Sequence, residues 1–169
     1  DDAQANDNQT NTNQTNHNTN VNTNVNAIDS GCPGRLEPVT PAGEHVVVGD
    51  GTPGSCTEVA LADAVTVTNG AANGGTITFD CGGEHRITLT GPLLVEGALI
   101  VDGEHRITLS GGNTTRIFDL DHYTDFVVQR ITLTEGLADE SGGAIHHPWY
   151  GSLMAIDATF VDNHCSSTD

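Results

Sequence analysis

Arginine, histidine and glutamate recur together in two near-identical segments, "GEHRITLTG" from Gly83 and "GEHRITLSG" from Gly103. On stacked strands Arg86 and Arg106, with Arg130 of a third copy, would form a basic ladder. Such a ladder beside carboxylates that hold calcium is what a uronate lyase needs, because a basic group must take the proton next to the substrate carboxylate. The repetition favours the alternative, a row of exposed ion pairs, since an active site requires one copy to differ from the others.

Histidine offers a second kind of chemistry. His85 and His105 occupy the same place in the two copies, and His146 is followed by His147, so either pair could approach a metal ion. Neither pair has a third ligand at a suitable spacing. No Ser-His-Asp order, nucleophile elbow, phosphate loop or dinucleotide fingerprint can be assembled around them. We therefore predict no catalytic, cofactor-binding or metal-ligating residue, with surface-bound calcium as the alternative.

Composition restricts the partners of the chain. It has 169 residues, with 23 acidic side chains against five basic ones, all arginine, and a formal net charge of −18. This charge opposes binding to nucleic acid or to an anionic membrane. No run of about 18 apolar residues is present, so we expect no membrane span. No signal segment stands at the amino end, as expected of a processed chain.

Four cysteines, Cys32, Cys56, Cys81 and Cys165, make an even set in an acidic chain rich in Asn, Thr and Gly. This usage is typical of exported proteins and predicts disulfides and a secreted, cell-surface location. Cys56 and Cys81 flank the start of the folded body, so we predict that they pair. Cys32 and Cys165 stand at its opposite ends and could join one subunit covalently to the next.

The chain divides by composition into a tail, residues 1–34, and a folded domain, residues 35–169. The tail is too rich in Asn and Thr to fold by itself. In the domain one helix is predicted over 57–68, with Thr57 as N-cap and Asn69-Gly70 as its end. Its apolar positions at helical spacing are Val59, Ala60, Ala64 and Val67.

Short β runs follow Gly75, separated by Gly, Asp and Asn. Aligning Ile87, Ile107 and Ile131 gives offsets of 20 (107−87) and 24 (131−107), which predicts a solenoid of stacked turns. Within a copy, apolar and hydroxyl side chains alternate, so one face is buried. Glycines are expected at the corners, where the chain changes direction; they are Gly82, Gly83, Gly91, Gly97, Gly103, Gly111, Gly112, Gly136, Gly142 and Gly143.

The order "VVVGDGTPGSCTEVALADAV", "GGTITFDCGG", "ITLTGPLLVEGALIVDGE", "ITLSGGNTTRIFDL" and "ATFVDN" resembles the amino-terminal part of bacterial surface and secreted proteins with a pectin-lyase-like architecture. The resemblance covers about residues 46–165. It implies an all-β, right-handed parallel β-helix of about four turns, with a capping helix at its amino end behind an extended tail. This architecture hosts lyases, adhesins and inert surface proteins, so it implies no particular chemistry.

Asparagine stands at every second position from Asn16 to Asn26, with Thr and Val among the residues between. This alternation predicts a strand that adds to another subunit, although a flexible stalk has the same composition. Candidate interface residues in the tail are Asn16, Asn18, Asn20, Val21, Asn22, Asn24, Val25 and Asn26. Trp149, Tyr150 and Phe160 are further candidates; the first two could bind sugar or a partner, or pack as a loop.

The end of the sequence, "AIDATFVDNHC", stays strand-like and shows no cap, so we expect that either the given chain is cut here or a neighbouring molecule covers this end. Together with the tail, this predicts a structural subunit of an extracellular bacterial filament or surface layer. Copies would stack end to end and exchange tail strands to form a homopolymer. The alternative is a polysaccharide-binding or polysaccharide-lyase-like domain on a flexible stalk.

Overall fold

The computed structural model describes residues 36–148 and 150–166. The chain divides into two units, Asp1–Arg35 and Leu36–Asp169, and only the second contains described residues. The predicted strand donor from Asn16 to Asn26 therefore lies outside the described residues, as do Cys32 and Trp149. No helix in the described part is long and apolar enough to cross a membrane.

The largest sheet has seven strands in the order β1-β2-β5-β7-β10, with β3 paired to β5 and β11 paired to β7. Its strands are β1 Glu44–Val48, β2 Gly75–Phe79, β3 His85–Thr88, β5 Leu99–Ser110, β7 Thr124–Thr134, β10 Gly151–Ile156 and β11 Thr159–Val161. A three-stranded sheet has the order β4-β6-β9, and β8 pairs with β12. These strands are β4 Leu93–Val95, β6 Phe118–Leu120, β8 Leu137–Ala138, β9 Ile145–His146 and β12 His164–Cys165. All the pairs in these sheets are parallel.

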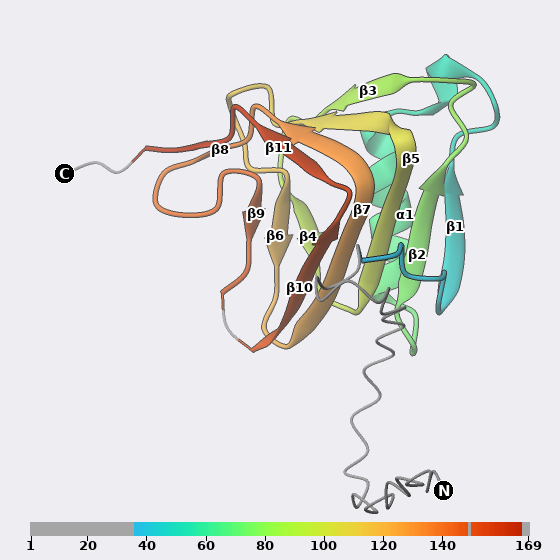
Figure 1. Cartoon of the computed structure of the whole chain (residues 1–169), viewed down its shortest axis with the longest axis horizontal. Helices are drawn as coiled ribbons and strands as arrows, with labels where there is room; N and C mark the ends of the chain where they lie inside the picture. Colours follow the sequence, from blue (N-terminus) through green and yellow to red (C-terminus); the bar gives the residue numbers. More distant parts are fainter. Residues whose placement is uncertain (1–35, 149, 167–169) are drawn as a thin grey trace, which may run out of the picture. The chain divides into compact units, whose positions relative to one another are not determined.

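The two longest strands, β5 and β7, bend partway along their length (Figure 1). The first part of β5 pairs with β2 and the last part with β3, and the register with β7 shifts between Asp102 and Ile107. In β7 Arg130 has a φ of 51°. At Gly103 a Cβ atom would lie 2.8 Å from the Arg130 carbonyl oxygen, so glycine permits the close approach of the two strands. The large sheet thus folds around the core in two halves.

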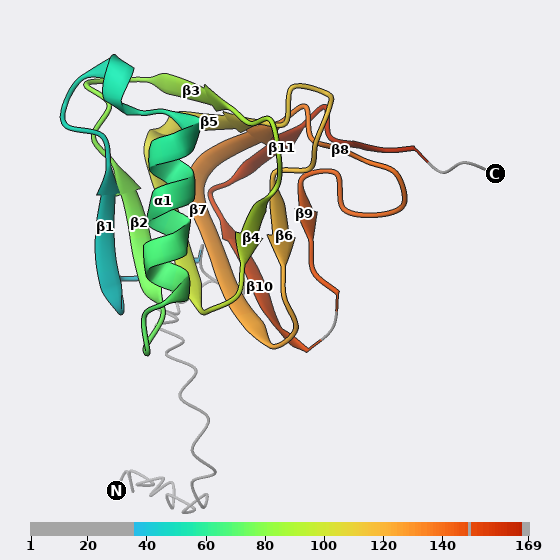
Figure 2. The ribbon, with the colours of Figure 1, turned by 180° about the vertical axis from the view of Figure 1, so that it is seen from behind.

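The helix α1, Glu58–Asn69, follows the short 3-10 helix η1, Pro53–Ser55. It lies beside β4, so that helix and three-stranded sheet together face the large sheet (Figure 2). The core fills the space between these layers. Phe118 of β6 and Phe126 of β7 pack across it with ring centroids 4.9 Å apart, and both side chains are buried.

The predicted start of the helix is confirmed, whereas its predicted apolar face is wrong in part. Thr57 is the N-cap and its side chain accepts a hydrogen bond from the Ala60 N–H at 3.1 Å. Val59 and Val67 are 68% and 51% exposed, although both were expected to face the protein. The buried stripe instead follows the helical spacing from Leu61; its members are Leu61, Ala64, Val65 and Thr68.

The prediction of an all-β, right-handed parallel β-helix of about four turns is wrong. Strands make up 45% and helices 12% of the described residues, and α1 contributes to the core, so the fold is mixed α/β with parallel sheets. The predicted offset of 24 between Ile107 and Ile131 is confirmed. However, Ile87 pairs with Leu109, an offset of 22 (109−87), so the two near-identical copies are not aligned. Because this slip is even, Ile87 still faces inward.

Candidate functional site

The repeated Arg and His residues of the sequence meet at one polar hollow of about 420 Å³. Its lining includes Glu84, His85, Arg86, His105 and Arg106. Each arginine in the described part has an acidic partner; the ion pairs are Arg86–Glu135, Arg106–Glu104, Arg116–Asp119 and Arg130–Asp102. A uronate carboxylate would have to displace one of these partners. The hollow therefore gives little support to an acidic-polysaccharide groove.

Asp102 and Gln129 form a buried polar cluster on the middle strands of the large sheet. Gln129 Nε2 donates to Asp102 at 2.8 Å and to the Val39 carbonyl at 3.0 Å, and Arg130 Nε donates to Asp102 at 2.9 Å. Burial raises the pKa of Asp102, but the hydrogen bonds from Arg130, the Glu104 N–H and Gln129 and the charge of Arg130 outweigh it. The pKa is held below its ordinary value, so the carboxylate stays ionised. Asp102 thereby holds adjoining strands together.

Two of the four histidines considered as metal ligands, His85 and His146, make local hydrogen bonds. His85 Nε2 lies 2.9 Å from the Cys56 carbonyl oxygen, and His146 Nδ1 lies 2.7 Å from Asp119 Oδ1. Across residues 36–148 and 150–166, no three His, Cys, Asp or Glu side chains are grouped as metal ligands. The second histidine of the sequence repeat, His105, lines the polar hollow described above. His147 Nε2 is buried and has no hydrogen-bond partner in the described structure, so hydrogen bonds account for two of the four histidines.

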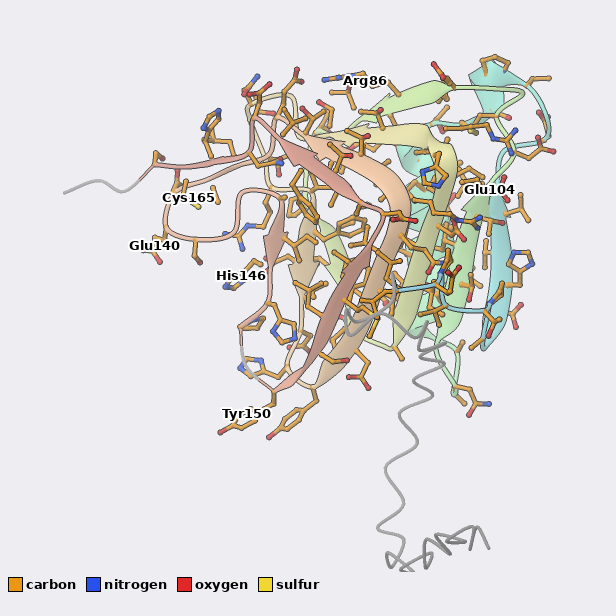
Figure 3. The ribbon with its side chains drawn as sticks, in the orientation of Figure 1. Arg86, Glu104, Glu140, His146, Tyr150 and Cys165 are labelled. Carbon is orange, nitrogen blue, oxygen red and sulfur yellow. A yellow bond between two sulfur atoms is a disulfide. The ribbon has the colours of Figure 1, made fainter. Side chains whose placement is uncertain are left out.

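The structure joins Cys56 to Cys81, the pairing favoured by the sequence, with Cα atoms 5.6 Å apart. Cys56 Sγ lies 3.3 Å from the Val48 carbonyl oxygen, so the disulfide covers the end of β1. Cys165 on β12 is an exposed free thiol (Figure 3). Its predicted partner Cys32 lies outside the described residues, so the predicted bridge between subunits stays a prediction.

At the β1 end of the molecule, α1 covers both the core and the edge of β4. Glu58 accepts a hydrogen bond from the Thr90 N–H at 2.6 Å. Asn69 donates to the Leu94 carbonyl at 2.9 Å and accepts from the Glu96 N–H at 3.0 Å. These side chains satisfy main-chain groups that a further strand would otherwise bind. We call this covered side the closed end.

At the opposite side, β10 and β11 are the last strands of the large sheet, and none of the described strands pairs with their outer edges. Leu153 of β10 is paired in register with Phe126, and Phe160 of β11 with Leu133. Phe126 and Leu133 are 0% exposed, whereas Leu153 and Phe160 are each 46% exposed. Core positions thus reach the solvent here, and we call this side the open end.

The sequence identified Phe160 as an interface candidate but missed its apolar neighbours at the open end. Leu153, Met154 and Val161 are 46%, 38% and 43% exposed. Their signal was present in the strand-like run "LMAIDATFV". Register, which the sequence did not fix, decides which of them stands over a core position.

A pair of stacked aromatic rings stands at the corner before β10. Tyr123 and Tyr150 have ring centroids 5.2 Å apart and planes 12° apart, and they are 74% and 69% exposed. Both have left-handed backbones, with φ of 65° and 58°, at a cost of about 1–2 kcal/mol each. The sequence singled out Tyr150, which projects from the corner in Figure 3, but not Tyr123. The feature of the sequence that could have identified Tyr123 is its position just before a predicted strand.

These features favour association over catalysis, because the polar hollow is compensated by internal ion pairs while the open end exposes core positions. Comparison of the chain with protein-family models, curated proteins and solved structures found no match. The geometry of the two ends is therefore the basis for assigning a function.

Proposed function

We propose that the protein is a structural subunit that associates end to end through β10 and β11, and that its copies build a filament or surface layer outside a bacterial cell. The observation that carries the proposal is the exposure of Leu153 and Phe160 at positions where the preceding strand has fully buried side chains. An edge of unpaired main-chain groups beside exposed apolar side chains is a template for pairing with another chain.

The β1 edge of a second copy is the partner surface we assign to the open end. β1 has five residues and β10 has six, so the two edges are similar in length. No described strand pairs with the outer side of β1. Exposed valines lie on this strand and on the helix that contacts it: Val47 on β1 is 48% exposed, and Val59 and Val67 on α1 are 68% and 51% exposed. A contact between two different edges leaves one of each kind free, so addition continues and gives a filament.

Charge opposes this association and makes it depend on salt. The formal net charge of −18 means that approaching copies repel each other. At an ionic strength of 0.1 M the Debye length is about 10 Å, and at 1 M it is about 3 Å, so salt screens the repulsion but not the apolar contact. We expect assembly to grow with sodium chloride concentration.

Tail exchange and a bridge between Cys32 and Cys165 belong to the same proposal as secondary contacts. The exposed position of Cys165 on β12 supports the bridge, since β12 lies on the same side of the molecule as β11. Non-reducing gels of the wild type, Cys32→Ser and Cys165→Ser test it. A ladder that appears only in the wild type and disappears on reduction is expected; no ladder in any sample contradicts the bridge.

The main contact is tested by sedimentation velocity and negative-stain microscopy across protein and salt concentrations, with Cys165→Ser as the background. We expect the parent to form rods and the added pair Leu153→Asp and Phe160→Asp to remain monomeric. Leu94→Asp is the matched control, because Leu94 is 56% exposed on β4 at neither proposed edge. Circular dichroism checks that each variant is folded. A parent that stays monomeric at high salt, or that stops at a closed dimer, contradicts the filament.

A further inference from the structure

The chain contains two tyrosines, and the structure stacks them on each other. Tyr123 directly precedes β7 and Tyr150 directly precedes β10, and the residues that follow them, Thr124 and Gly151, are register partners. The two backbones are therefore neighbours in adjacent parallel strands, which lie about 4.8 Å apart. With 74% and 69% of their surfaces exposed, the rings are open to reagents in solution.

The stack does not form a shared platform for a sugar ring. A platform needs two ring faces that look the same way, whereas here one face of each ring covers the other. The remaining free faces look in opposite directions along the stack. The stack instead holds the ring carbons of the two phenols close to one another, which is the requirement for joining them.

We propose that Tyr123 and Tyr150 are a site of oxidative cross-linking and form a dityrosine within one subunit. Hydrogen peroxide, acting through a haem peroxidase, removes one electron and one proton from each phenol. The two phenoxyl radicals couple through ring carbons next to the phenol oxygens. Each ring then transfers the hydrogen of its bonded carbon to its oxygen. Two tyrosines and one peroxide thus give one dityrosine and two waters.

Geometry favours the bond within a subunit over one between subunits. The rings are already in contact at 5.2 Å between centroids, so the partner radical is present as soon as it forms. Both rings are mostly exposed, so little packing resists the small rotation that coupling requires. The rate should therefore not depend on protein concentration.

The bond would fasten β10 to β7 and close a loop of 27 residues (150−123). This loop contains β8 and β9, and β10 is the strand whose outer edge is unpaired in the described part. The cross-link would restrict the unfolded chain and raise the midpoint of thermal unfolding, by roughly 5 °C or more. This inference is independent of whether copies of the protein assemble.

The test alkylates the free thiols of dilute, folded protein, leaves the Cys56–Cys81 disulfide intact, and then oxidises the protein with hydrogen peroxide and a haem peroxidase. Cleavage after arginine places Tyr123 in peptide 117–130 and Tyr150 in peptide 131–169, so the two separate unless they are joined. We expect one linked pair of these peptides, lighter by two hydrogen atoms than their sum, from monomeric protein. Its yield should be unchanged over a tenfold dilution.

Tyr123→Phe and Tyr150→Phe are the matched controls, because each keeps a ring in the stack but leaves a single tyrosine. Neither variant should give the linked peptides or gain thermal stability on oxidation. Tandem mass spectrometry must place the bond on the two tyrosines. The proposal is overturned if native monomer gives no linked pair, if the link lies on Trp149, or if dityrosine is found only in oligomers whose yield falls on dilution.

Discussion

The large sheet ends in a parallel strand on both sides, but the inward-facing side chains of the two end strands differ in how far they are exposed to solvent. Val48 of β1 and Leu153 of β10 both face inward on an end strand, yet Val48 is 1% exposed and Leu153 is 46% exposed. Main-chain pairing does not distinguish them, since each end strand is paired on one side in the described structure. What differs in the described structure is the cover: α1 and the disulfide provide it at the closed end, and no described helix or disulfide provides it at the open end.

The cover also acts on polar groups. Asn69 and Glu58 occupy main-chain donors and an acceptor along the β4 segment, so that edge is less available to another strand. Within residues 36–148 and 150–166, no strand pairs with the outer edges of β10 and β11, and no helix covers them as α1 covers β4. An end of a parallel sheet is therefore closed by side chains from a neighbouring element, and a strand alone does not close it.

The largest effect is expected from replacing the same residue type at the two ends. Leu61→Ala at the closed end removes a side chain that is 0% exposed, and should lower the free energy of unfolding by about 3 kcal/mol or more. Leu153→Ala at the open end should cost about 1 kcal/mol or less, because much of its surface already meets water. Urea unfolding of dilute protein at low salt measures both. Equal losses would contradict the distinction between the ends.

Opening the disulfide should weaken the closed end by a somewhat smaller amount. Cys56 and Cys81 are 25 residues apart, so the double replacement by alanine should lower the free energy of unfolding by about 3 kcal/mol. Cys165→Ser changes an exposed free thiol and should leave it within about 0.5 kcal/mol of the parent. Thermal unfolding with and without reductant gives the same ranking. A Cys165 variant as unstable as the double variant would refute it.

A loss smaller than those at Leu61 and at the disulfide is expected for Asp102, which lies on a middle strand and serves as a reference for both ends. Its pKa is lowered in the folded state, so its contribution is complete above the unfolded pKa of about 3.9 and is lost as the pH falls through the folded value. Asp102→Asn should cost about 2 kcal/mol at pH 7. Urea unfolding of the parent and the variant at pH 7 and at decreasing pH below about 3.9 should show the difference in their free energies of unfolding shrinking as Asp102 takes up a proton. A gap that stays constant contradicts the assignment.

Local features of the fold could be predicted from the sequence. Thr57 caps its helix through a contact three residues away, and Ile87 and Leu89 are buried because alternation needs only neighbouring residues. The candidate site depends on longer distances. Phe160 was named, but Leu153 and Tyr123 were not, because their importance follows from which residue lies beside them on the next strand.

The fold class was wrong for a related reason. Two near-identical segments were read as equal units in equal places, yet Ile87 lies beside Leu109, two positions beyond the residue it resembles. The long strands β5 and β7 both bend. In β7, the residue with the left-handed backbone is Arg130 and not a glycine. Repetition in a sequence fixes which side chains alternate, whereas spacing along neighbouring strands also depends on corners of unequal length.

Parallel pairing also governs the order in which this protein gains its structure. Along the large sheet, successive partners are 31 (75−44), 24 (99−75) and 27 (126−99) residues apart, so each pairing must close a long loop before it is rewarded. Because α1 forms from adjacent residues and contacts β1 and β2, we expect it to give the chain an early nucleus there. Growth then runs towards β10, and the last strand to dock should be the first whose amide protons exchange.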